Sequence, residues 1–144
     1  MPVARAFEPP DVSDPPFLAP LECVVDLPFP PSTNRIWRHD GNHRNRMIHL
    51  SPEYRKWKDK ADVAVVANGC WRKRVVMPGR FSVLILLSRA RQRGDLDNRI
   101  KALLDWAQRV ELILDDKFCE EITARWAPTA ECPHGCRMIF RSVA

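Results

Sequence analysis

Apolar runs bounded by turn residues predict four strands in this chain. Residues 21–27 and 81–88 are rich in aliphatic and β-branched side chains, and the run at 81–88 is apolar enough for a buried strand. Two more strands are expected near residues 120–127 and 137–143. Residues 28–34 contain three prolines, which lack an amide donor, so this segment predicts a rigid turn and not a central strand.

Two segments have the hydrophobic spacing of helices. Ser51, Pro52 and Glu53 form a helix start, with a capping hydroxyl, a proline in the first turn and an acid near the positive end of the helix dipole. This helix ends at Asn68-Gly69, and the apolar stripe along it consists of Tyr54, Trp57, Ala61, Ala64 and Val65. A second helix is predicted from about residue 96 to residue 109, with a core-facing side made of Ile100, Leu103, Leu104 and Ala107.

The order of these elements predicts an α/β domain of the two-layer α+β type, with a mixed β-sheet and both helices packed on one face. A chain of 144 residues with 45% hydrophobic residues is long enough for one domain with its own core. We assign this domain to residues 21–144, because residues 1–20 contain six prolines and predict a flexible arm. Residues 35–50 are expected to form a weak hairpin with Asp40-Gly41-Asn42 at its tip.

The five cysteines have irregular spacing, which predicts buried free thiols and not a disulfide framework. Cys132, His134 and Cys136 have residue types found in zinc sites, but the set is incomplete, and the intervening proline and glycine favour a tight hairpin turn. No apolar run approaches the roughly 18 residues of a membrane span. The first residues lack the features of a secretory signal, so we expect a cytoplasmic protein without a membrane partner.

Positive charge is concentrated in the middle of the chain. Residues 35–101 hold 17 Lys and Arg against 6 Asp and Glu, a local excess of +11, whereas the whole chain has a net charge of +5. This asymmetry favours a polyanionic partner, and nucleic acid is the commonest one for a soluble protein. A solvated basic surface is the alternative.

Carboxylates within this basic region indicate a divalent-metal site. Asp95 follows the apolar run at 81–88, Asp97 lies in the first turn of the predicted helix, and Lys101 is four residues further on the same face. Asp115-Asp116 would return to this edge after the helix. Mg²⁺ prefers oxygen ligands and assists phosphodiester hydrolysis, so a few aspartates on rigid elements suffice.

A structural role is the alternative for the same side chains. Asp95 would then cap the helix, Asp97 would pair with Lys101 on the surface, and Asp115-Asp116 would form a turn. We interpret Asp105 as solvated surface or as the partner of Arg109.

The motifs RGDLDNRIKALLDW and LILDD resemble the signature of the RusA-type Holliday-junction resolvases, endonucleases of phages and bacteria that cut four-way DNA junctions. LPFPPSTNRIWRH is similar to the N-terminal motif of that family, and the resemblance covers about residues 21–143. It implies a RusA-like fold in which Asp95, Asp97 and Asp116 are the Mg²⁺-binding catalytic aspartates and Lys101 is the catalytic lysine. Asp115 is the adjacent acid, a further ligand or a support, and Gly94 stands where the family often has a basic residue.

The resemblance further implies a homodimer that resolves Holliday junctions by paired symmetric nicks during DNA recombination and repair, in a bacterial or phage-encoded, nucleoid-associated setting. Mn²⁺ is the alternative to Mg²⁺. We expect contacts to four-way or branched DNA from Arg35, Arg38, Arg91, Arg93 and Asn34. The rival hypotheses are a non-catalytic protein that binds branched or single-stranded DNA, and a nuclease for other branched DNA.

Overall fold

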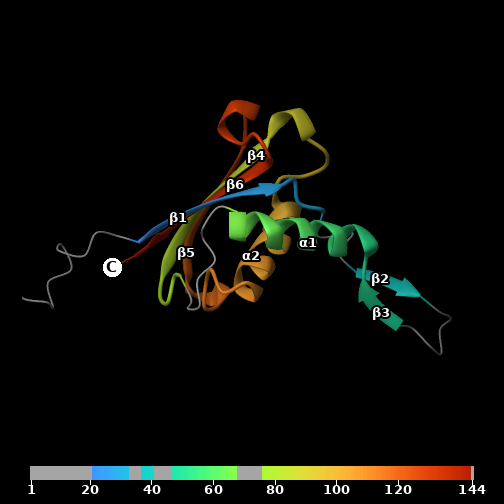
Figure 1. Cartoon of the computed structure of the whole chain (residues 1–144), viewed down its shortest axis with the longest axis horizontal. Helices are drawn as coiled ribbons and strands as arrows, with labels where there is room; N and C mark the ends of the chain where they lie inside the picture. Colours follow the sequence, from blue (N-terminus) through green and yellow to red (C-terminus); the bar gives the residue numbers. More distant parts are fainter. Residues whose placement is uncertain (1–20, 33–36, 41–46, 68–75, 144) are drawn as a thin grey trace, which may run out of the picture.

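The computed structural model describes residues 21–32, 37–40, 47–67 and 76–143. The predicted N-terminal arm and most of the predicted hairpin tip lie outside the described residues. Within the described ranges, the chain forms a four-stranded sheet, a separate two-stranded sheet and two α-helices (Figure 1).

The four-stranded sheet is mixed, as predicted. Its strand order is β1 (Glu22–Pro28), β6 (Gly135–Ser142), β4 (Phe81–Ser88) and β5 (Cys119–Ala127). Strand β6 pairs antiparallel with both β1 and β4, whereas β4 and β5 are parallel. Parallel strands need a crossover connection, and helix α2 (Ile100–Arg109) lies in the connection between β4 and β5.

Both helices pack on one face of this sheet, which confirms the predicted fold class (Figure 1). Successive strand residues point to opposite faces. Thus Ile85 and Leu87 belong to the main core, while Leu86 belongs to a small second cluster with Ala127 and Cys132. Helix α1 (Pro52–Ala67) and helix α2 supply the other side of the main core with Tyr54, Trp57, Ala61, Val65, Ala102, Leu103, Leu104, Trp106 and Ala107.

The two helices also contact each other directly. The rings of Trp57 in α1 and Trp106 in α2 meet edge to face, with their centroids 6.0 Å apart. The indole Nε1 of Trp106 donates to Asp62 Oδ1 at 3.0 Å, and Arg109 pairs with the same carboxylate. These contacts fix α2, and with it the candidate residues that α2 carries.

The predicted start of the first helix is confirmed. The amide of Tyr54 donates to Ser51 Oγ at 3.2 Å, so Ser51 caps α1 as its position before Pro52 indicates. The predicted second helix instead begins with a 3₁₀ turn, η4 (Asp97–Arg99), and becomes α-helical only at Ile100. The predicted weak hairpin is present as the antiparallel pair β2 (Trp37–Asp40) and β3 (Met47–Leu50).

The turn predicted at residues 132–136 is present, but the hairpin that it was expected to close is not. A turn does form, since the Gly135 amide donates to Cys132 O at 3.0 Å. However, the strands that it joins, β5 and β6, are separated in the sheet by β4. Gly135 has a φ of +115°, and a Cβ there would lie 2.8 Å from the Phe29 backbone nitrogen, so the close approach of these segments requires glycine.

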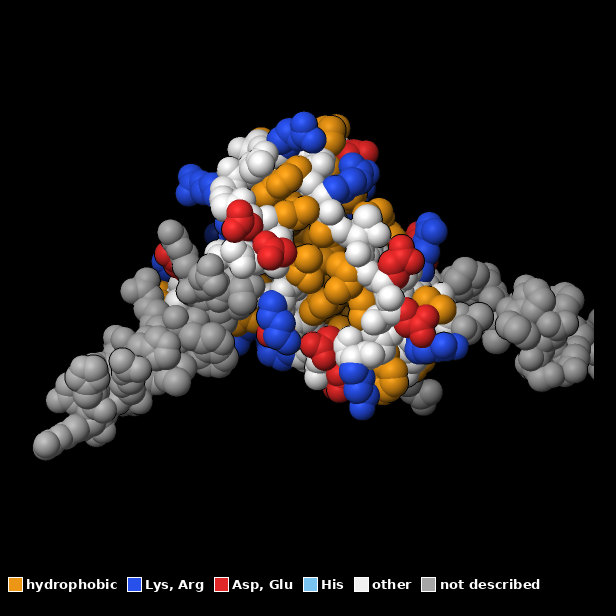
Figure 2. All heavy atoms as spheres, turned by 180° about the vertical axis from the view of Figure 1, so that it is seen from behind, with side chains coloured by type: hydrophobic (Ala, Val, Ile, Leu, Met, Phe, Trp, Pro, Cys, Tyr) orange, Lys and Arg blue, Asp and Glu red, His pale blue; other side chains and the backbone are white. Residues whose placement is uncertain are grey.

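The described cysteines are free thiols, as predicted. Cys23, Cys132 and Cys136 are buried, and Cys119 is half-buried. Seen from behind, the surface has a central band of hydrophobic side chains bordered by charges of both signs (Figure 2). Neither helix in the described part of the chain has the length and hydropathy needed to cross a membrane.

Candidate active site

The candidate site begins where β4 ends. The chain leaves the sheet through a 3₁₀ turn, η3 (Arg89–Arg91), and continues to Asp95, which is exposed. We call residues 89–95 the arginine loop. Gly94 in this loop has a φ of +64°, a conformation that suits glycine, and a Cβ at this position would meet no heavy atom within 4 Å.

Valine in place of Gly94 is therefore expected to lower the free energy of unfolding by about 1–2 kcal/mol, through backbone strain and not through a clash. Asparagine, which tolerates this conformation, should cost clearly less. Urea denaturation of both variants measures the difference. Equal losses for valine and asparagine would show that the conformation of Gly94 does not decide the effect.

Residues from the two separated acidic motifs meet at Lys101. Its Nζ lies 2.7 Å from Asp105 Oδ1 and 3.3 Å from Asp116 Oδ2. Asp116 opens a short 3₁₀ turn, η5 (Asp116–Phe118), and its amide donates to Gln108 Oε1 at 3.3 Å. The segment after α2 thus returns to the exposed side of that helix, while the expected meeting of Asp116 with Asp95 and Asp97 stays a prediction.

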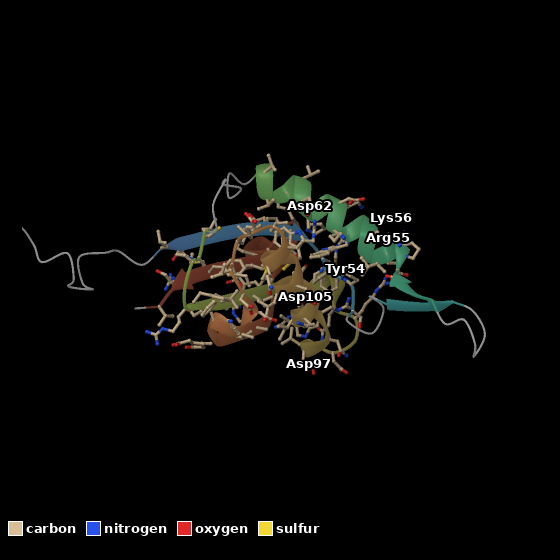
Figure 3. The ribbon with its side chains drawn as sticks, turned by 90° about the horizontal axis from the view of Figure 1, so that it is seen from below. Tyr54, Arg55, Lys56, Asp62, Asp97 and Asp105 are labelled. Atoms are coloured by element: carbon tan, nitrogen blue, oxygen red, sulfur yellow. The ribbon has the colours of Figure 1, made fainter. Side chains whose placement is uncertain are left out.

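Asp105 lies on the solvated surface, as predicted, with its side chain 43% exposed, but the alternative of Asp105 as the partner of Arg109 is wrong. Asp105 pairs with Lys101, while Arg109 pairs with Asp62. Among the described residues no ion pair joins Asp97 to Lys101, so the alternative of an Asp97–Lys101 surface pair is wrong as well. The reason is helix geometry: Asp97 lies in a 3₁₀ turn, where side chains four apart are not aligned, whereas Lys101 and Asp105 share the α-helix. Figure 3 shows the labelled side chains of Asp97, before the start of α2, and of Asp105, within α2, at separate positions.

The surroundings of Lys101 keep it protonated. The hydrogen bond to Asp105 is the largest cause that raises the pKa of Lys101 above its ordinary value, and the hydrogen bond to Asp116 raises it further. Partial burial acts in the opposite direction. Lys101 is therefore a cation throughout the neutral pH range, and it suits a role in charge neutralisation better than a role as a base.

Asp115 has a structural role. Its carboxylate accepts a hydrogen bond from the Lys117 amide at 2.9 Å and caps η5. This hydrogen bond is the main cause that lowers the pKa of Asp115, and Asp116 contributes as well. The turn predicted as the alternative for the Asp115-Asp116 pair is therefore present.

Asp95 and Asp97 have exposed residues, and within the described part of the chain their carboxylates make no hydrogen bond or ion pair. Neither η4 nor α2 has a side-chain hydrogen bond that caps its start, so the alternative of Asp95 as a helix cap is wrong. Unengaged carboxylate oxygens are the donors that Mg²⁺ prefers, so the residue types fit this ion.

The arrangement itself is not a complete metal site. Among the residues that the structure describes, no group of three or more Asp, Glu, His or Cys side chains is placed to hold an ion. Lys101 and Asp116 are brought together, but Asp95 and Asp97 are not gathered at the same point. The ligand set of Asp95, Asp97 and Asp116, with Asp115 beside it, stays a prediction.

A pocket of about 890 Å³ lies beside the arginine loop, and Arg91, Arg93 and Asp95 are among its lining residues. Arg91 and Arg93 are exposed, as expected for residues that contact DNA. The other predicted DNA-binding positions cannot be compared in this way, because Asn34, Arg35 and the side chain of Arg38 lie outside the described residues.

Two residues at this pocket have contacts that the sequence does not predict. Arg99 is buried and donates to the carbonyl oxygens of Pro30 and Arg93, at 2.7 and 2.8 Å. Trp57 donates from Nε1 to the carbonyl of Pro28 at 2.9 Å. Both side chains hold the proline-rich segment, residues 28–31, which we call the proline turn. A lone arginine within an arginine-rich stretch gives no signal in sequence that it is buried.

The chain matches a known protein family. The profile of the family described as Endodeoxyribonuclease RusA matches residues 28–134, which is more than half of the chain. The chain belongs to the RusA family. The match runs from the proline turn to the segment beyond Asp116, and it confirms the predicted family and the enzyme class, an endodeoxyribonuclease.

Individual RusA proteins are similar to the chain over most of their length. The proteins named crossover junction endodeoxyribonuclease RusA from Shigella sonnei (strain Ss046) and from Escherichia coli (strain K12) are each 33% identical to it over 92 residues. The aligned region covers 64% of this chain and 72% of each relative.

Proposed function

We propose that this RusA-family chain is a Mg²⁺-dependent, structure-specific endodeoxyribonuclease that resolves Holliday junctions by paired symmetric nicks in recombination and repair. The observation that carries the proposal is the contact between Lys101 and Asp116 at 3.3 Å. It joins two motifs of the family signature on an exposed surface. A surface ion pair contributes only about 0–1 kcal/mol to stability, so this contact adds little to the fold.

The proposed metal ligands are Asp95, Asp97 and Asp116, with Asp115 as a support through its cap on η5. Bound Mg²⁺, or Mn²⁺, supplies activation of a water and neutralisation of charge on the phosphate. The open carboxylates of Asp95 and Asp97 suit this role. Asp116 contacts Lys101 in this structure. When Asp116 binds the metal instead, Lys101 keeps its ion pair with Asp105.

Lys101 is proposed to neutralise negative charge that develops on the phosphate being cut. Its raised pKa keeps it protonated, and its side chain is more than half exposed, so DNA can reach it. Positioned cations of this kind stabilise the transition state of phosphoryl transfer.

Asp105 is proposed to orient Lys101. Asp105→Asn removes the negative charge from the contact at 2.7 Å, which leaves Asp116 as the remaining acidic partner of Lys101. We expect the Mg²⁺ concentration for half-maximal cutting to rise about two- to fivefold, the scale of an exposed ion pair. Junction affinity in EDTA should not change. The matched control is Asp59→Asn, an exposed carboxylate on α1, and an equal shift in both variants would contradict the role of Asp105.

DNA binding is proposed to use the backbone phosphates. Arg91 and Arg93 line the pocket beside Asp95, and Arg35, Arg38 and Asn34 extend the basic region in the sequence. Contacts of this kind do not read sequence and weaken steeply with salt. We further propose a homodimer, because two symmetric sites supply the two cuts that junction resolution needs.

The direct test is incubation of the purified protein with a synthetic four-way junction, with Mg²⁺ or with EDTA, followed by mapping of the nicks. The expected result is a pair of nicks on opposite strands, symmetric about the junction centre, in Mg²⁺ only. Binding without nicks in Mg²⁺ would favour a non-catalytic binder. Equal cutting of flaps and junctions would favour a nuclease for other branched DNA.

A further inference from the structure

We infer that Arg99 is a positioning residue that clamps the arginine loop to the proline turn and so holds Arg91, Arg93 and Asp95 in place for DNA. This inference rests on the proposed function, because its effect is read in DNA binding. Arg99 itself is 8% exposed and therefore lies beneath the surface that DNA would contact.

The first observation is that one guanidinium joins two distant segments. Nη1 donates to the carbonyl of Pro30, 69 residues away, and Nη2 donates to the carbonyl of Arg93, 6 residues away. The planar fork of an arginine can hold two acceptors at once in a fixed geometry, which a lysine ammonium cannot reproduce. A single side chain therefore bridges the two segments.

The second observation is the stacking beneath the guanidinium. Arg99 Cζ lies 4.9 Å from the centre of the Phe29 ring, and Phe29 in turn stacks on Trp126 with centroids 6.1 Å apart and planes 15° apart. The guanidinium is thereby fixed in orientation as well as in position. Phe29 also lines the pocket, but its ring is engaged by both Arg99 and Trp126, so it acts as support for Arg99 and not as a stacking platform for a base.

The third observation explains why a donor is needed at this point. Proline nitrogens carry no hydrogen, so the proline turn cannot complete a regular ladder of backbone hydrogen bonds. Side chains supply the donors: Arg99 serves Pro30, and Trp57 serves Pro28. Buried charged donors form strong hydrogen bonds, and removing one leaves its acceptors without compensation.

The two segments that Arg99 joins both belong to the candidate site. The proline turn and the arginine loop both line the pocket of about 890 Å³, the first with Pro30 and the second with Arg91, Arg93 and Asp95. Arg99 also lies between Asp97 and Lys101 in sequence, but it is buried where those two are exposed. Within this short segment, Asp97 and Lys101 therefore face solvent, whereas Arg99 points into the protein.

Hydrogen–deuterium exchange tests the clamp without DNA. Arg99→Lys keeps the charge but cannot bridge both carbonyls, and Arg99→Met removes the charge. We expect faster exchange of amides in residues 89–95 in both variants, with the amides of β6 unchanged. Unchanged exchange in residues 89–95 of folded Arg99→Lys would overturn the inference, and this variant suffices if Arg99→Met does not fold.

Junction binding in EDTA over a salt series tests the effect on DNA. Loss of two phosphate contacts makes the slope of log K against log salt shallower by about 1.8, at about 0.9 for each phosphate. We expect Arg99→Lys to approach this change although Arg91 and Arg93 remain present. Arg141→Met, which removes an exposed arginine paired with Glu22 on the sheet, is the matched control and should leave the slope nearly unchanged.

A double-mutant cycle separates positioning from general destabilisation. Arg99→Lys is combined with the paired change of Arg91 and Arg93 to alanine. If Arg99 acts through these arginines, the combined loss of affinity is smaller than the product of the separate losses. A combined loss equal to that product would overturn the inference. If the wild-type protein bound no junction, the proposed function would fail, while hydrogen exchange would still decide whether the clamp exists.

Discussion

Asparagine in place of Asp95 is expected to abolish junction cutting while junction binding stays close to that of the wild type. Asp95 is exposed at the edge of the pocket, and its carboxylate makes no ion pair among the described residues. Its removal should therefore leave the fold intact. Loss of a metal ligand removes several kcal/mol of transition-state stabilisation, which corresponds to about a thousandfold or more in rate.

Single-turnover cutting of a preformed junction complex measures this rate without a contribution from binding. Glu111→Gln is a suitable control, because Glu111 is an exposed acid beyond the end of α2. It should cut at the wild-type rate. Cutting by Asp95→Asn at a rate near that of Glu111→Gln would remove Asp95 from the proposed ligand set.

Methionine in place of Lys101 is expected to lower the cutting rate about a hundredfold, as found when one positioned stabilising group is removed from an active site. Lys101→Arg should recover part of the rate, because it retains the positive charge. The effect on metal affinity should be smaller than the effect on rate. Single-turnover rates over a Mg²⁺ titration separate the two quantities.

The pH dependence of the same reaction tests the form in which Lys101 acts. The hydrogen bond that Lys101 donates to Asp105, followed by the one to Asp116, raises the pKa of Lys101, so the protonated form persists above the ordinary lysine range. Between pH 6 and 9 the wild type and Lys101→Arg should therefore show pH–rate profiles of the same shape. A limb that is present in the wild type and absent in Lys101→Arg would indicate that Lys101 acts as a base.

The sequence predicts elements well where local signals agree. The apolar run at Phe81–Ser88 is strand β4 with the predicted bounds, and Ser51 caps α1 because its hydroxyl precedes a proline in the first turn. Family motifs are short and local too, which is why the RusA resemblance is confirmed by the match over residues 28–134.

The sequence does not predict contacts that depend on the fold. Arg99 reaches Pro30 across 69 residues, and a basic residue in a basic stretch is expected to be solvated. Lys101 has an acid four residues away on either side, Asp97 and Asp105. The choice between them depends on a 3₁₀ turn that no apolar spacing indicates. The strand order also could not be inferred, since β5 and β6 are adjacent in sequence but separated by β4.

The arrangement of the acidic residues could likewise be predicted only in part. The return of Asp116 to helix α2 follows from element order, and the contact with Lys101 agrees with it. The positions of Asp95 and Asp97 relative to Asp116 depend on the path of two short 3₁₀ turns, η3 and η4, which lie on either side of Gly94. Side-chain patterns do not encode such a path.

The proposed metal site depends most on Asp116 joining Asp95 and Asp97 around one ion. Counting bound Mn²⁺ by electron paramagnetic resonance, in the presence of a four-way junction, tests this directly. Asp115 and Asp116 form a matched pair, because asparagine at position 115 can still cap η5. We predict that the wild type and Asp115→Asn bind Mn²⁺ with similar affinity, whereas Asp116→Asn binds it at least about tenfold more weakly. Mn²⁺ binding by Asp116→Asn at the wild-type affinity would contradict the proposed ligand set of Asp95, Asp97 and Asp116.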